Sequence, residues 1–141
     1  MQPIDQRQLW DDKHARGEHA SYVHEPVNFA LDAEKDFPRN STVLDLGCGI
    51  GADAEYFAQE NHIVEAIDFS SIVIEQNNKR SHRGVTYSTF DISQALPYDS
   101  QSFDVVYAHL SIHYFSDSVT RGIIKEVARV LKPRGKFYFR C

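Results

Sequence analysis

The chain has 141 residues, of which 42% are hydrophobic, and this is enough for one compact domain with a proper core. Its formal net charge is −5 and no run of lysine or arginine exceeds two residues, which argues against nucleic acid as a general partner. It has no apolar stretch of about eighteen residues and no signal peptide, so we expect no membrane partner and a cytoplasmic location.

Two helices are predicted in the first forty residues. The first covers about residues 4–16 and ends at Gly17. The second follows Pro26 and has Val27, Ala30 and Leu31 at helical spacing, so these apolar side chains are expected to face a sheet. Turn-forming residues at 37–40 lead into the first strand.

From there to the end of the chain, strands alternate with helices. Strands are predicted at residues 43–46, 63–68, 85–90, 103–109 and 136–140, and helices at 51–60, 71–81 and 118–131. The last helix has a core stripe of Ile123, Ile124, Val127, Val130 and Leu131. This alternation predicts an α/β, Rossmann-like fold: a mostly parallel, doubly wound sheet with helices on both faces.

Residues 43–51 form the most informative motif, a buried strand that runs directly into a glycine-rich turn and a helix. Glycines at alternate positions, Gly47, Gly49 and Gly51, allow a tight turn and a close approach of ligand to backbone. Two residues before the first glycine, Asp45 places an acid at the carboxyl end of the strand. The motif therefore predicts a ligand site at this edge of the sheet.

A dinucleotide loop is the main competing interpretation, because Gly47-x-Gly49-x-x-Ala52 fits that pattern too. A dinucleotide places its pyrophosphate at the helix start, where Asp45 would repel it. A ligand with an ammonium and a sulfonium but no phosphate would be attracted instead. S-adenosylmethionine is such a ligand.

Two further strands are followed by acids at the spacing that such a site requires. Asp68 ends the second predicted strand, 21 residues past Gly47, where Rossmann-like folds bind ribose hydroxyls. Asp91 follows the third. Taken singly, Asp45 is also explained as a surface acid, Asp68 as a cap of the helix near Ser70, and Asp91 as a turn former.

This constellation resembles the class I S-adenosylmethionine-dependent methyltransferases, whose first motif is an acid followed by x-Gly-x-Gly-x-Gly. The resemblance implies that Asp45 binds the methionyl amine and that the glycine loop approaches the cofactor closely. The cofactor-binding residues it implies are Asp45, Gly47, Cys48, Gly49 and Gly51 in the loop, Asp68 and Phe69 at the ribose, Asp91 and Ile92 at the adenine, and His109 and Tyr22.

The N-terminal segment is similar to the entry segment of small-molecule methyltransferases of the tellurite-resistance and thiopurine groups. This likeness rests on Trp10, His14, Tyr22 and Pro26 and implies a helical lid at residues 1–40 over a core at residues 41–141. Trp10 is equally well explained as an ordinary anchor on the sheet.

Methyl transfer needs an aligned acceptor more than a catalytic residue, because the sulfonium already activates the methyl group. If the acceptor must lose a proton, the candidate bases follow the fourth strand: His109, His113 and Tyr114. The sequence thus predicts transfer to a small-molecule acceptor. The alternatives are a non-catalytic cofactor-binding module or inactive fragment and, less favoured, a nicotinamide-dependent oxidoreductase.

The chain stops within the fifth predicted strand, whereas the resembled family continues through another helix and two antiparallel strands. We therefore expect a fragment, or an aromatic edge at residues 137–139 covered by a second copy of the chain or by a missing C-terminal segment. Cys48 and Cys141 form no disulfide framework. Only His109 and His113 have zinc-ligand spacing and they lack a third ligand, so no metal is expected.

Overall fold

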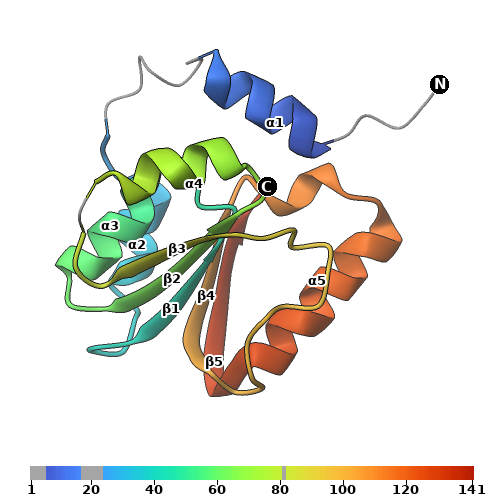
Figure 1. Cartoon of the computed structure of the whole chain (residues 1–141). Helices are drawn as coiled ribbons and strands as arrows, with labels where there is room; N and C mark the ends of the chain where they lie inside the picture. Colours follow the sequence, from blue (N-terminus) through green and yellow to red (C-terminus); the bar gives the residue numbers. More distant parts are fainter. Residues whose placement is uncertain (1–5, 17–23, 81) are drawn as a thin grey trace.

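The computed structural model describes residues 6–16, 24–80 and 82–141, and within these its centre is a five-stranded parallel sheet (Figure 1). The strands are β1 (Thr42–Leu46), β2 (Ile63–Asp68), β3 (Val85–Thr89), β4 (Phe103–His109) and β5 (Leu131–Arg140). Their order in the sheet is β3-β2-β1-β4-β5. This confirms the predicted Rossmann-like α/β fold.

Helices cover both faces of the sheet. They are α1 (Gln6–Ala15), α2 (Asn28–Glu34), α3 (Ala52–Gln59), α4 (Ser71–Asn78) and α5 (Asp117–Val130), together with the short 3₁₀ helix η1 (Ile112–Tyr114). The chain moves outward one way through β1, β2 and β3 and the other way through β4 and β5. Because such crossovers are right-handed, α3 and α4 lie on one face and α5 on the other.

Two hydrophobic clusters, one on each face, follow from the alternation of side chains along the strands. In β1, Val43 packs with α2, α3 and α4, whereas Leu44 and Leu46 pack with α5 and the loop after β3. Asp45 shares the face of Val43, so this carboxylate lies inside the molecule under the start of α3. A strand that is apolar on both faces is expected in a covered parallel sheet.

Several element boundaries differ from the prediction. β5 begins at Leu131, immediately after α5, where Leu131 pairs with Phe103 of β4. Regular pairing resumes only at Lys136, opposite Val105, so the predicted break at residues 132–135 lies inside the strand rather than before it. α4 ends at Asn78, and Ile124, expected in the core stripe of α5, is 40% exposed.

β5 is an edge strand, and among the described residues it pairs with β4 alone. Its aromatic side chains are less exposed than predicted: Phe137 packs against the cluster of α5, and Tyr138 lies 5.4 Å from the ring of Phe37 on the opposite face. Only Phe139 is largely exposed. What covers this edge stays a prediction.

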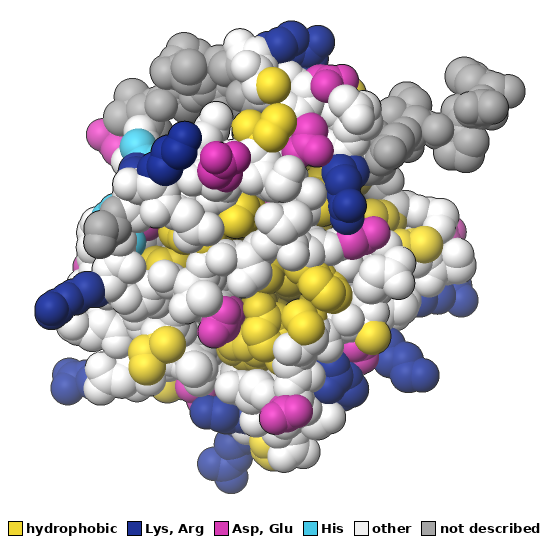
Figure 2. Space-filling model, in the orientation of Figure 1, with side chains coloured by type: hydrophobic (Ala, Val, Ile, Leu, Met, Phe, Trp, Pro, Cys, Tyr) yellow, Lys and Arg dark blue, Asp and Glu magenta, His cyan; other side chains and the backbone are white. Residues whose placement is uncertain are grey.

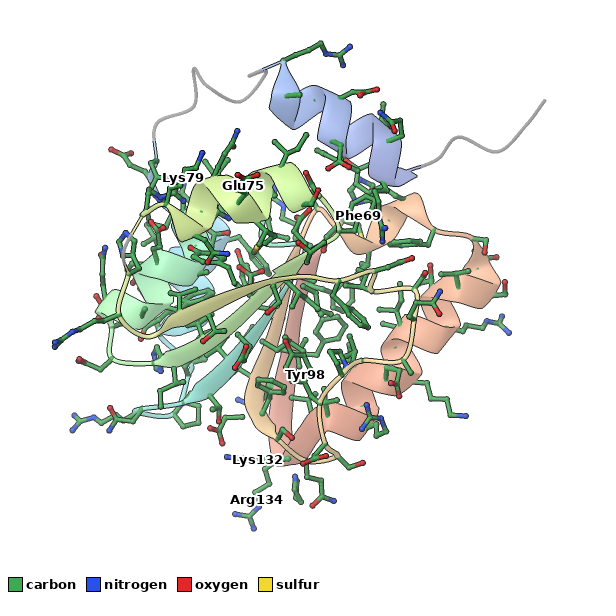
Figure 3. All side chains as sticks on the ribbon, viewed as in Figure 1. Phe69, Glu75, Lys79, Tyr98, Lys132 and Arg134 are labelled. Carbon is green, nitrogen blue, oxygen red and sulfur yellow. The ribbon has the colours of Figure 1, made fainter. Side chains whose placement is uncertain are left out.

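Basic side chains lie mostly at the periphery of the face shown in Figure 2, around a centre of apolar side chains. Figure 3 shows Lys132 and Arg134 at the end of the sheet opposite Phe69, which follows the carboxyl end of β2. None of the helices in the described ranges is long and apolar enough to cross a membrane.

Candidate functional site

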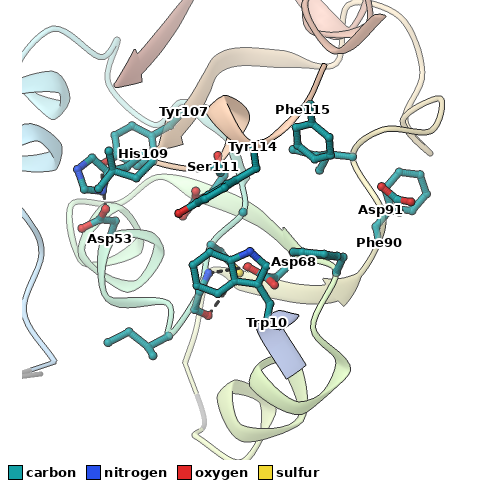
Figure 4. Close-up of a pocket in the computed structure, with 18 residues that line it drawn as sticks. Trp10, Asp53, Asp68, Phe90, Asp91, Tyr107, His109, Ser111, Tyr114 and Phe115 are labelled. Atoms are coloured by element: carbon teal, nitrogen blue, oxygen red, sulfur yellow. Dashed lines mark hydrogen bonds between the residues drawn. The ribbon is translucent and has the colours of Figure 1, made fainter. Parts of the chain in front are cut away.

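A cavity of about 290 Å³ opens at the carboxyl ends of the strands, where the strand order reverses between β1 and β4 (Figure 4). This is the position at which open α/β sheets bind ligands. Ten residues predicted for the site line it: Asp45, Gly47, Cys48, Gly49, Asp68, Phe69, Asp91, Ile92, His109 and Tyr114. Gly51 and His113 do not line it, and Tyr22 lies outside the described residues.

The three glycines of the loop have positive φ angles but different surroundings. A Cβ added to Gly49 would meet no atom within 4 Å, so at this residue the backbone faces open space. At Gly51 it would lie 2.2 Å from the Tyr87 hydroxyl, and that glycine instead makes room for the core. The backbone of Gly49 therefore has room beside it for a ligand, whereas Gly51 is required by packing against Tyr87.

Asp45 is the most unusual group in the cavity wall. Its side chain is only 2% exposed, and Oδ2 has no hydrogen-bond partner among the described residues. Burial, reinforced by the neighbouring carboxylates of Asp53 and Asp68, raises the pKa of Asp45 well above its ordinary value. A buried carboxylate oxygen with no partner is costly unless a cation or a donor from a ligand satisfies it.

Asp68, in contrast, is already well bonded. Its Oδ2 accepts from the backbone N–H of Gly49 at 3.0 Å, and its Oδ1 accepts from that of Ser70 at 3.0 Å. The Ser70 hydroxyl also donates to Asp11 of α1 at 2.7 Å, which links the N-terminal helix to the site. Asp68 thus fixes the glycine loop, and its oxygens keep lone pairs that can accept further hydrogen bonds.

At one end of the cavity, Asp53, Tyr107 and His109 lie together (Figure 4). Asp53 Oδ2 accepts from the Tyr107 hydroxyl at 2.8 Å, and Oδ1 accepts from the backbone N–H of Val27 at 2.9 Å. Burial lowers the pKa of His109, an effect that nearby Asp53 partly opposes, so the imidazole is neutral at pH 7. This end therefore combines a fixed carboxylate with a neutral imidazole.

At the other end, Phe90 and Asp91 provide a mixed apolar and acidic wall (Figure 4). Asp91 Oδ1 accepts from the backbone N–H of Ser93 at 2.9 Å and from its hydroxyl at 2.7 Å. Asp91 thus does form the predicted turn. The same residue still lines the cavity beside Ile92, so the turn also positions it there.

Comparison with known proteins agrees with this geometry. A methyltransferase domain family model matches residues 44–139. Among curated proteins, the chain is 33% identical over 118 residues to sarcosine/dimethylglycine N-methyltransferase of Aphanothece halophytica, covering 80% of this chain and 42% of that protein. It is 32% identical over 103 residues to phosphoethanolamine N-methyltransferase 1 of Triticum aestivum, covering 70% and 21%. The chain belongs to the class I S-adenosylmethionine-dependent methyltransferases.

Solved structures show the same fold. Phosphoethanolamine N-methyltransferase 1 of Haemonchus contortus, in complex with phosphoethanolamine and S-adenosylhomocysteine, superposes with a TM-score of 0.78 at 24% identity, covering 94% of this chain and 30% of that one. A methyltransferase of Haloferax volcanii in complex with the Trm112 activator gives 0.75 at 24% identity, covering 98% and 61%. The chain spans less than half the length of these two curated relatives.

The residues of this cavity fit the cofactor of the family, S-adenosylmethionine. Asp45 leaves a buried oxygen unpaired where a cationic group can satisfy it, and Gly49 leaves open space against the backbone. Asp68 and Asp91 add acceptor oxygens along the same cavity. The polar side chains that line the cavity are acidic or neutral, which suits a ligand that has positive charge and no phosphate.

A second layer of polar residues holds the glycine loop from below. Asn77 of α4 donates to the carbonyl of Gly49 at 2.7 Å. The Arg80 guanidinium donates to the carbonyl of Ile50 and to Asn77 Oδ1, the latter at 2.8 Å, and lies 3.2 Å from the buried carboxylate of Glu55. Asn77 of α4 and Arg80, two residues after the end of α4, thus both fix loop carbonyls.

Eight residues that line the cavity were not predicted as its ligands: Trp10, Ile50, Asp53, Phe90, Tyr107, Leu110, Ser111 and Phe115. Trp10 stands 5.5 Å from the ring of Tyr114 in an edge-to-face arrangement, which places α1 at the mouth. Ser111 donates to the carbonyl of Leu46 at 2.8 Å. Most of these residues lie at or just after the end of a predicted strand, and this position in the sequence could have identified them.

Proposed function

We propose that this protein transfers the methyl group of S-adenosylmethionine to a small-molecule acceptor by in-line displacement. The observation that carries the proposal is the buried, unpartnered Oδ2 of Asp45 inside a cavity at the switch point of the sheet. An ammonium group would satisfy this oxygen. Family membership and small-molecule relatives support the same assignment.

Four residues of the cavity bind the cofactor in this proposal. Asp45 binds the methionyl ammonium, Asp68 the ribose hydroxyls, and Asp91 with the backbone of Ile92 the adenine. The cofactor supplies a methyl group that its sulfonium has already activated. The protein aligns the acceptor and excludes water, which together can account for roughly 7–11 kcal/mol of the barrier.

The N-terminal helix contributes a cover. Trp10 lies at the mouth against Tyr114, and Asp11 is bonded to Ser70 beside the ribose position. We propose that α1 limits access of water to the reacting atoms. α2 has a different role, because it packs with Ala30 and Ala33 in the core under the sheet.

The proposal is tested by incubating the protein with methyl-labelled S-adenosylmethionine and a panel of small amines, alcohols, phenols and carboxylic acids. Acceptor-dependent formation of S-adenosylhomocysteine is the expected result.

Asp68→Asn should weaken cofactor binding by about tenfold or more, since a buried charge-assisted hydrogen bond is lost.

One alternative is supported by a specific observation. The chain covers only 42% and 21% of two curated relatives, so it can be a cofactor-binding module whose acceptor-binding part lies elsewhere. Saturable cofactor binding without transfer to any acceptor of the panel would favour this module and contradict catalysis by the chain itself.

A further inference from the structure

The charge of the cavity wall restricts the acceptor. Four carboxylates line the cavity, those of Asp45, Asp53, Asp68 and Asp91, and no lysine or arginine is among the described residues that line it. Residues 1–5, 17–23 and 81 contain no lysine or arginine either. Bound S-adenosylmethionine carries an ammonium, a sulfonium and one carboxylate, which leaves acidic groups uncompensated.

Asp53 is the carboxylate that the cofactor assignments leave unused. It lies in the first turn of α3, fixed by the backbone N–H of Val27 at 2.9 Å and by the hydroxyl of Tyr107 at 2.8 Å. These bonds orient the carboxylate, and each oxygen keeps a lone pair for a further donor. Asp53 lies close enough to Asp45 for its charge to raise the pKa of that buried carboxyl, so it adds negative charge beyond the group that the cofactor ammonium would satisfy.

Aromatic rings complete the surroundings of this end of the cavity. Tyr107, whose hydroxyl is bonded to Asp53, stacks on Phe29 at a centroid distance of 5.5 Å, and Phe29 also stacks on His109. Trp10 and Tyr114 meet at a centroid distance of 5.5 Å with ring planes at 77° and line the cavity farther from Asp53 (Figure 4). Aromatic faces attract ammonium groups, most strongly where water is excluded. Carboxylates and rings without basic side chains would bind a carboxylate or phosphate acceptor poorly.

We propose that the methyl acceptor is a cationic amine, held by Asp53 and the aromatic wall beside His109; this assignment of substrate class rests on the proposed function. The ammonium gives one proton to the His109 imidazole, which becomes imidazolium. The nitrogen lone pair then forms the bond to the methyl carbon, and the electrons of the carbon–sulfur bond pass to sulfur. The products are the methylated amine and S-adenosylhomocysteine.

The environment of His109 suits this proton transfer. Its ring is stacked on Phe29 at a centroid distance of 5.9 Å, and burial lowers its pKa, so the imidazole is unprotonated at pH 7 and keeps a ring nitrogen free for a proton. The nearby charge of Asp53 stabilises the imidazolium that results, whereas that of Arg140 opposes it.

Binding can be measured directly, because Trp10 is the single tryptophan of the chain and lies in the cavity wall. Trp10 fluorescence is recorded first with S-adenosylhomocysteine, then with tetramethylammonium chloride added to the loaded protein at constant ionic strength. Sodium pivalate serves as an anion and tert-butanol as a neutral molecule of similar shape. We expect a saturable response to tetramethylammonium alone.

The variants are Asp53→Asn and, as a matched control at the exposed start of α5, Asp117→Asn. Asp53→Asn should weaken tetramethylammonium binding by roughly fivefold or more and keep the response to S-adenosylhomocysteine, while Asp117→Asn should change neither. If Asp53→Asn does not fold, the cation-over-anion selectivity of the unmodified protein decides the question.

Equal responses to the cation and to pivalate, or a response to S-adenosylhomocysteine but none to tetramethylammonium, would overturn the amine assignment and leave the proposed function standing. If S-adenosylhomocysteine itself gives no response, the proposed function fails, and the amine assignment fails with it.

Discussion

Asp45 illustrates how a residue can be favourable for binding and unfavourable for folding. Its carboxylate is buried, Oδ2 has no partner within the described chain, and two further acids, Asp53 and Asp68, lie close enough to raise its pKa. In the free protein this group prefers to keep its proton. A bound ammonium would stabilise the ionised carboxylate. The burial of Asp45 therefore lowers the stability of the free protein and favours binding of a cation.

Asp45→Asn is therefore expected to raise the melting temperature of the free protein at neutral pH while it weakens S-adenosylmethionine binding by about tenfold or more. For an acid whose pKa is raised on folding, the contribution to stability is complete below the pKa of the unfolded chain and is lost as pH rises through the pKa of the folded state. Thermal unfolding and calorimetric titration of both proteins measure the two effects.

The pH series supplies the control for this variant. The stability difference between Asp45→Asn and the unmodified protein should shrink as pH falls toward the ordinary pKa of an aspartate, about 3.9, because Asp45 is then protonated in both states. A variant that is less stable at neutral pH, or one that binds the cofactor unchanged, would contradict the role given to Asp45.

Two glycines of one loop should respond differently to the same substitution. Gly49 has φ +53° and open space around an added Cβ, whereas at Gly51, with φ +83°, the Cβ would lie 2.2 Å from the Tyr87 hydroxyl. Gly49→Ala should cost about 1–2 kcal/mol of stability from backbone strain and lower cofactor affinity strongly. Gly51→Ala should cost more stability, since Tyr87 must move.

Thermal unfolding and cofactor titration of Gly49→Ala and Gly51→Ala make this comparison. Gly51→Ala is expected to lower the melting temperature more than Gly49→Ala. Gly49→Ala is expected to lower cofactor affinity more, relative to its drop in melting temperature. The reverse order would mean that the cofactor does not approach the loop at Gly49.

The acids of the site show what sequence reasoning could and could not find at the scale of residues. Asp45, Asp68 and Asp91 were placed by their position relative to predicted strand ends, and all three line the cavity. Asp53 was missed because it comes from the start of a helix, where an acid is ordinarily a favourable partner of the helix dipole. Its role depends on Tyr107, 54 residues away.

At the scale of elements, α4 and the turn that follows it support the glycine loop. Arg80 and Asn77 bind the carbonyls of Ile50 and Gly49, and Glu55 of α3 holds the guanidinium from the other side. Glu55 also accepts from the Tyr87 hydroxyl at 3.1 Å. The loop conformation is therefore set by three elements, α3, α4 and β3, that do not themselves supply its backbone.

Arg80→Lys should preserve the charge beside Glu55 but lose the guanidinium geometry that joins the Ile50 carbonyl to Asn77. We expect a weakening of S-adenosylmethionine binding by roughly three- to tenfold with a smaller change in melting temperature. Arg83→Lys, at an exposed position after α4, is the matched control and should bind normally. Equal affinities of the three proteins would show that the loop needs no such support.

Periodicity located the elements well but not their ends. Each of the five strands was predicted, because apolar runs of four to seven residues between turn signals are distinctive in a parallel sheet. The predicted start of β5 was wrong because Pro133 and Gly135 mark a break, whereas Leu131, before that break, already pairs with Phe103 of β4. η1 was not predicted, since a single helical turn carries no periodic pattern.

At the scale of the whole molecule, the sheet topology brings the residues of the candidate site together at one edge of the sheet. Reversal of the strand order between β1 and β4 leaves a crevice at their carboxyl ends, and the ends of four strands together with α1 supply its walls. The alternation of helix and strand predicted a mostly parallel, doubly wound sheet, but the order of its strands, and hence this meeting point, came from the structure. Its acidic character followed only from the side chains that the fold assembles.

The acidic charge of the cavity distinguishes between the two ligands, a dinucleotide and S-adenosylmethionine, that the glycine loop alone would fit. A nicotinamide dinucleotide would place a pyrophosphate near the start of α3, where Asp45 and Asp53 line the cavity and no lysine or arginine is among its described lining residues. S-adenosylmethionine has no phosphate and would instead present its ammonium to Asp45.

Calorimetric titration of the protein with S-adenosylmethionine and, in parallel, with NAD⁺ tests this central claim most directly. We predict saturable binding at one site for S-adenosylmethionine and no measurable binding for NAD⁺. Binding of NAD⁺ in preference to S-adenosylmethionine, or of neither ligand, would contradict the assignment of this acidic cavity to the methyl donor.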